Sequence, residues 1–115
     1  VMEGTGAAAG EAYAWAIENP DKVACICAQN PALRSLMTKT SPLDNLSPLA
    51  KAGIPLLHIC NKFDPRLDEQ TRTLEKRYQE LSGKITVIIN ESPQPYSLTT
   101  ADLNQTVNFV LKNSN

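Results

Sequence analysis

The sequence predicts an α/β domain in which a parallel sheet is covered by helices. Three short apolar runs have the length and composition of buried strands, over residues 22–28, 55–60 and 84–89. Helical patterns alternate with these runs, and such alternation favours parallel strands joined by helical crossovers. Three core strands make only a partial sheet, so we expect an incomplete α/β architecture.

The first helix is expected over residues 7–18, an Ala-rich segment that contains Tyr13 and Trp15. Asn19-Pro20-Asp21 ends it, because the residue before a proline disfavours helical geometry. The first strand-like run follows at residues 22–28. Prolines interrupt the next region, where short helices are expected over residues 32–37 and 46–52.

The second half repeats the alternation of strand and helix. A buried strand is expected over residues 55–60, and a helix whose apolar stripe is Leu67, Leu74, Tyr78 and Leu81. Ser82-Gly83 is expected to close that helix. The β-branched run 84–89 predicts another strand. The last helix should begin near Thr99, and its expected buried stripe is Leu103, Val107, Val110 and Leu111.

The size and charge of the chain restrict its function. Its 115 residues fit one domain, with 11 basic and 12 acidic side chains. A nucleic-acid or anionic-membrane surface would require a basic excess, so neither partner is expected. No apolar run approaches the roughly 20 residues that cross a bilayer. With one histidine and three cysteines outside motif spacing, we expect buried free thiols, no metal site and no cofactor.

The carboxyl ends of the predicted strands should meet at one edge of the sheet, since crossovers between parallel strands are right-handed. Ligands of open parallel sheets bind beyond that edge. It is predicted to carry residues 4–6, 29–30, 61–64 and 91–96.

Several strings resemble the α/β-hydrolase superfamily. Glu3-Gly4-Thr5-Gly6-Ala7 before an Ala-rich helix is similar to its strand–elbow–helix unit. Other similar strings are Asn19-Pro20-Asp21-Lys22-Val23, the run from Ser41-Pro42-Leu43-Asp44 to Ala52, and Pro55-Leu56-Leu57-His58-Ile59-Cys60. The resemblance covers the C-terminal half of that fold, from the nucleophile elbow onward. It implies a three-layer sandwich and a catalytic triad in the order Ser, acid, His.

The resemblance places the elbow at residues 4–8. Gly4 matches the first glycine, but Gly6 stands where the nucleophilic serine is expected and has no side chain that can attack. Thr5 lies one residue too early. In the turn Asn61-Lys62-Phe63-Asp64, Asp64 matches the triad acid.

The catalytic histidine should fall near Pro95, between Gln94 and Tyr96, and none of these is a base near neutral pH. The single histidine, His58, lies inside a predicted strand, where a structural role is expected. With Ser and His missing, the resemblance implies a degenerate, non-catalytic domain with Asp64 as the remnant of the triad.

The resemblance also implies that the strands before the elbow come from elsewhere. We expect residues 1–115 to be a segment of a longer protein, or a chain whose partner supplies the remainder of the hydrolase fold. The edge at the carboxyl ends of the strands, where the resemblance places the former active site, would suit a small polar ligand such as a carbohydrate. The side chains expected to bind it are Asn61, Lys62, Glu91, Gln94 and Tyr96.

Two alternatives remain open. The chain could belong to an active acyl or ester hydrolase whose catalytic residues lie outside this segment. It could also bind a dinucleotide through the turn containing Gly4, Gly6 and Gly10. That motif requires a preceding strand, which is not evident, and an acid about 20 residues on, where Gln29 and Asn30 stand.

Overall fold

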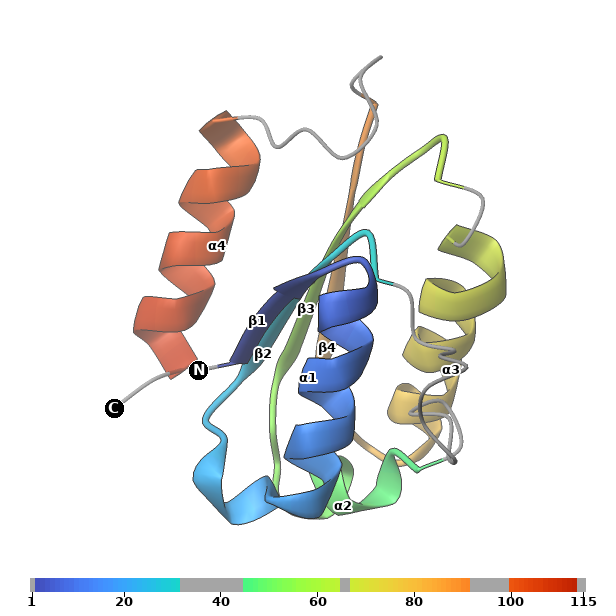
Figure 1. The fold of residues 1–115 in the computed structure, drawn as a ribbon. Coiled ribbons are helices and arrows are strands. Elements are labelled where there is room, and N and C mark those ends of the chain that lie inside the picture. The colour runs from blue at the N-terminus through green and yellow to red at the C-terminus, as the bar shows by residue number, and fades with distance from the viewer. Residues whose placement is uncertain (1, 32–44, 65–66, 92–99, 114–115) are drawn as a thin grey trace.

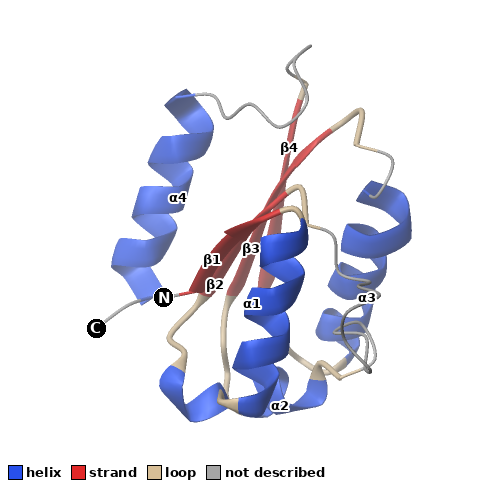
Figure 2. Cartoon of the chain, viewed as in Figure 1, coloured by secondary structure: helices blue, strands red, loops and turns tan. Residues whose placement is uncertain are grey.

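The computed structural model describes residues 2–31, 45–64, 67–91 and 100–113, and it has an α/β fold. The parallel strands follow one another across the sheet in sequence order: β1 (Met2–Thr5), β2 (Ile26–Gln29), β3 (Leu56–Asn61) and β4 (Ile85–Asn90). The helices are α1 (Ala7–Glu18), α2 (Ser47–Lys51), α3 (Arg72–Glu80) and α4 (Thr100–Asn113). Helices α1, α2 and α3 lie on one face of the sheet and α4 on the other (Figures 1 and 2). The predicted parallel sheet covered by helices is therefore confirmed.

The sheet has one strand more than the sequence predicted. The extra strand, β1, contains Glu3 and Gly4. It has no apolar run from which a strand could be predicted. Hydrogen bonds to β2 and the residue before it hold β1 in the sheet. The Met2 N–H donates to the Cys25 carbonyl at 3.0 Å, and the Gly6 N–H donates to the Gln29 carbonyl at 3.1 Å. The apolar strand β2 is therefore internal, and β1 and β4 form the two edges.

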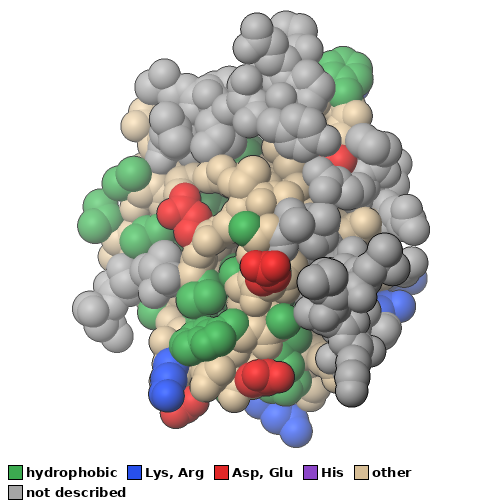
Figure 3. All heavy atoms as spheres, viewed as in Figure 1, with side chains coloured by type: hydrophobic (Ala, Val, Ile, Leu, Met, Phe, Trp, Pro, Cys, Tyr) green, Lys and Arg blue, Asp and Glu red, His purple; other side chains and the backbone are tan. Residues whose placement is uncertain are grey.

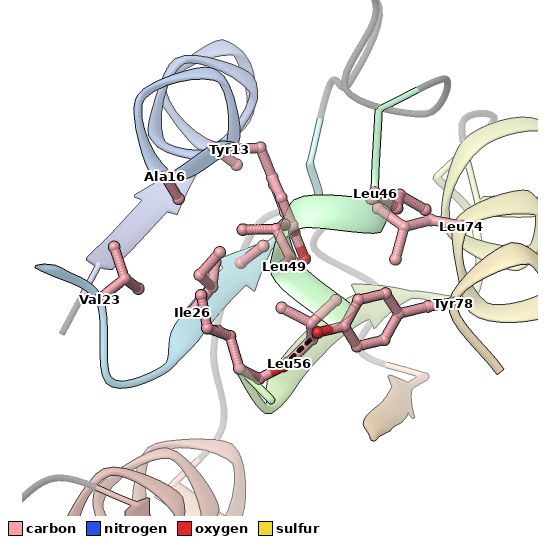
Figure 4. Packing of buried hydrophobic residues seen from close by; sticks show 12 residues of the cluster. Tyr13, Ala16, Val23, Ile26, Leu46, Leu49, Leu56, Leu74 and Tyr78 are labelled. Carbon is pink, nitrogen blue, oxygen red and sulfur yellow. Dashed lines mark hydrogen bonds between the residues drawn. The ribbon is translucent and has the colours of Figure 1, made fainter. Parts of the chain in front are cut away.

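Alternation along β3 divides the core between the two faces of the sheet. A large apolar cluster fills the space between the sheet and helices α1 to α3, around Tyr13, Leu49 and Tyr78 (Figure 4). A smaller cluster on the other face consists of Cys27, Leu57 and Ile59, with Ile88, Phe109 and Val110 packed against it. Fully buried β-strand residues on both faces explain the uninterrupted apolar runs in the sequence.

The apolar stripe expected on the last helix is only partly buried. Val110 packs on the sheet together with Phe109, as expected of one member of the stripe. Val107 and Leu111 are 55% and 71% exposed, so the prediction for these two residues is wrong. The helix turns its Thr106, Phe109 and Val110 side to the sheet, and the position of the sheet rather than the pattern sets that rotation. Among the described residues, no helix is long and apolar enough to cross a bilayer.

The end of α3 differs from expectation in which residue takes the left-handed conformation. Ser82 has a φ of 64°, whereas Gly83 donates its N–H to the Tyr78 carbonyl at 2.8 Å. A Cβ on Gly83 would overlap the Tyr78 ring. The glycine therefore permits close approach to an aromatic ring, and the serine makes the turn. The short helix expected over residues 32–37 lies outside the described residues.

Candidate functional site

The register of the sheet brings the predicted edge together. Thr5 pairs with Gln29 and Asn61 pairs with Asn90, so the strands end at one level. Residues 4–6, 29–30, 61–64 and Glu91 therefore share the carboxyl edge, as predicted. Gln94 and Tyr96, the remaining side chains assigned to this edge, lie outside the described residues.

Gly6 forms a sharp turn between β1 and α1. Its φ of 59° and ψ of −127° lie in a region that residues with a side chain rarely adopt. The Gly6 carbonyl accepts a hydrogen bond from the Ala9 N–H at 3.1 Å, which starts the helix directly after the strand. A Cβ on Gly6 would meet no atom within 4 Å, so the position assigned to the nucleophile faces open space.

Gly4 is required by close packing between β1 and α1. A Cβ on Gly4 would lie 2.7 Å from the Ala9 nitrogen and 2.8 Å from the Ala8 carbonyl carbon. Both atoms belong to the backbone of α1 and cannot rotate away. Gly4 therefore lets the helix fold back onto its own strand.

Thr5 does not stand at the nucleophile position. Its hydroxyl donates to the Gln29 Oε1 at 2.9 Å, and the Gln29 amide donates to the Glu3 Oε1 at 3.4 Å. These three side chains form a surface row along β1 and β2. Thr5 is thereby engaged with Gln29 rather than directed to the tip of the turn.

Asp64 lies at the end of the turn that follows β3, and it is only 6% exposed. Its N–H donates to the Asn61 carbonyl at 3.0 Å, and its own carbonyl accepts from the Leu67 N–H at 3.1 Å. The Phe63 N–H donates to the Asn61 side-chain oxygen at 2.8 Å. These bonds hold the turn from Asn61 to Asp64 in a defined shape.

Three buried asparagines lie side by side at the carboxyl ends of three adjacent strands: Asn30 just after β2, Asn61 at the end of β3 and Asn90 at the end of β4. Asn61, which is fully buried, donates its Nδ2 to the Asn90 Oδ1 at 2.7 Å. The Asn61 N–H donates to the Asn30 Oδ1, also at 2.7 Å. Of these three, only Asn61 was expected from sequence to bind a ligand, although residue 30 was also placed on the edge. The detectable signal is that Asn90 comes directly after a predicted strand and Asn30 two residues after another.

His58 is a structural residue, as expected. It is fully buried on β3, with its Nε2 2.6 Å from the Tyr13 hydroxyl and its Nδ1 3.2 Å from the Thr71 hydroxyl. Burial lowers the pKa of His58 to about 3, because the charged imidazolium would lose its hydration. With both ring nitrogens occupied inside the core, His58 offers no base to the edge.

Lys62 and Glu91 form an exposed ion pair on the edge, with 3.7 Å between Lys62 Nζ and Glu91 Oε1. Water and salt screen such pairs, so it contributes little to stability. The same Nζ lies 5.7 Å from the centroid of the Phe63 ring, which is 59% exposed. Phe63 is a further exposed side chain of this edge that the sequence did not single out.

The three cysteines, Cys25, Cys27 and Cys60, are free and buried, as predicted. Burial raises the pKa of all three thiols, that of Cys27 to about 12. They are therefore poor nucleophiles at neutral pH. Within the described ranges no group of three His, Cys, Asp or Glu side chains could hold a metal ion.

Charge on the surface is mixed, as the net charge of −1 requires. On the face seen in Figure 3, the Lys and Arg side chains that the structure describes lie toward the lower and right margins. A hollow on α3 is lined by three basic side chains together with Thr73 and Glu80; the basic ones are Arg72, Lys76 and Arg77.

No family model matches the chain, and no curated protein or solved structure matches it either.

Proposed function

We propose that the chain is an α/β-hydrolase-like domain without catalytic chemistry of its own. Its role would be structural support or the binding of a small polar ligand, for example a carbohydrate, at the carboxyl edge. Its partner would be the remainder of a hydrolase fold, in the same chain or in another.

The conformation of Gly6 is the observation that carries this proposal. The nucleophile of an α/β-hydrolase sits on a sharp, strained turn between a strand and a helix. Gly6 occupies such a turn, with a φ of 59° and a ψ of −127°, and the space beyond it is open. A strained turn that no longer presents a side chain fits a scaffold that has kept its backbone and lost its chemistry.

The other triad positions support the same proposal. Asp64 stands in a defined turn at the carboxyl edge, where it could orient a histidine. The single histidine of the chain, His58, is instead fully buried and bonded to Tyr13 and Thr71. A triad without serine and histidine loses many orders of magnitude in rate.

Polar groups along the edge support a ligand-binding role. Lys62 and Glu91 supply exposed cationic and carboxylate groups beside the exposed Phe63 ring, whereas the buried Asn61 amide holds Asn90 and the turn in place. Hydrogen-bonding groups next to an apolar surface suit a small hydroxylated ligand. On sequence grounds Gln94 and Tyr96 belong to the same proposed site.

Dinucleotide binding is a second candidate, because β1 now precedes the glycine turn, which the sequence alone did not reveal. Against it, Gln29 stands at the end of β2 where an acid should hold the ribose, and its side chain is bonded to Thr5 and Glu3. A titration with NAD that leaves the intrinsic fluorescence unchanged would exclude this candidate.

Hydrolysis of a short-chain acyl ester by the full natural protein, beside its Asp64→Ala variant, tests the main proposal. We expect no turnover above buffer for either protein. Turnover that falls in the Asp64→Ala variant would mean that this edge performs chemistry and that the proposal is wrong. Turnover that is equal in both proteins would assign the activity to residues outside this segment, which is the active-hydrolase alternative.

A further inference from the structure

We draw no further inference here: the strongest candidate, the largely apolar surface hollow that Pro20, Pro48 and Ala52 line together with Asp21, Ser47 and Lys51 where the 3-10 turn Pro20–Lys22 meets α2, carries none because nothing in the structure shows what covers it.

Discussion

The Tyr13 hydroxyl lies 2.6 Å from the His58 Nε2, and the two rings meet edge to face with their centroids 5.7 Å apart. This contact joins α1 to the middle of β3. On the other side of the imidazole, Nδ1 lies 3.2 Å from the Thr71 hydroxyl, in the π-helical turn Leu67–Thr71 that precedes α3. A fully buried polar chain thus fixes the helix after Gly6 and the segment after Asp64 to the same strand.

Removing the hydroxyl in Tyr13→Phe should destabilise the protein by about 1–3 kcal/mol, because one buried nitrogen of His58 then loses its partner. Urea denaturation measures this loss. Trp15→Phe on the same helix is the control, and it should cost less than about 0.5 kcal/mol since Trp15 is 43% exposed. Equal stability of Tyr13→Phe and the natural protein would mean that the contact contributes nothing.

Stability should fall as the pH is lowered below the unfolded pKa of histidine, about 6.5. Burial holds the folded pKa of His58 near 3, so between these values the unfolded chain binds one proton more than the folded one. The contribution of His58 is complete above pH 6.5 and is lost toward pH 3, at about 1.4 kcal/mol per pH unit.

The free energy of unfolding of the natural protein and of His58→Gln, measured between pH 5 and 7, checks this dependence. His58 is the single histidine, so its contribution to the slope of the unfolding free energy against pH should be absent from His58→Gln. Identical slopes for the two proteins would show that His58 titrates alike in the folded and unfolded states.

The fold class could be predicted from sequence because β2, β3 and β4 are apolar or β-branched and helices separate them. Strand β1 could not, because Glu3 and Gly4 carry no strand signal and extend only by pairing with β2. The rotation of α4, which exposes Val107 and Leu111, depends on where the sheet lies.

The site shows the same division between local and tertiary information. The sequence assigned Asn61 and Asp64 to one edge because they follow a predicted strand, and the resemblance to the hydrolase elbow assigned Gly4 and Gly6 to it. The sequence placed residue 30 on that edge but could not show that the Asn30 side chain accepts a hydrogen bond from Asn61, 31 residues away in the chain.

Serine substitutions at the two glycines of the first turn should differ sharply. The Cβ of Gly6→Ser would contact no other atom, so this variant should lose only the free energy of backbone strain, about 1–3 kcal/mol of stability. Gly4→Ser places its Cβ 2.7 Å from the Ala9 nitrogen and should lose more stability, because the backbone cannot yield. Thermal denaturation followed by circular dichroism compares them, and a more stable Gly4→Ser would contradict the described turn. Gly6→Ser should gain no ester hydrolysis, since the buried His58 cannot act as its base.

The thiols should resist modification in the folded protein. Their raised pKa values and burial leave little accessible thiolate at pH 8. We expect no rapid reaction of Cys25, Cys27 or Cys60 with an aromatic disulfide reagent until denaturant is added, after which three thiols per chain react. A thiol that reacts rapidly in the native state would show that one of these side chains is accessible.

The absence of an activated nucleophile is the central claim, and reaction of the full natural protein with a fluorophosphonate tests it most directly, because this reagent phosphonylates serines that an adjacent base activates. The adduct is located by mass spectrometry of tryptic peptides. We predict no adduct on any serine of these 115 residues, in agreement with Gly6 at the tip of the turn and His58 inside the core. A stoichiometric adduct on a serine within this segment would contradict the account.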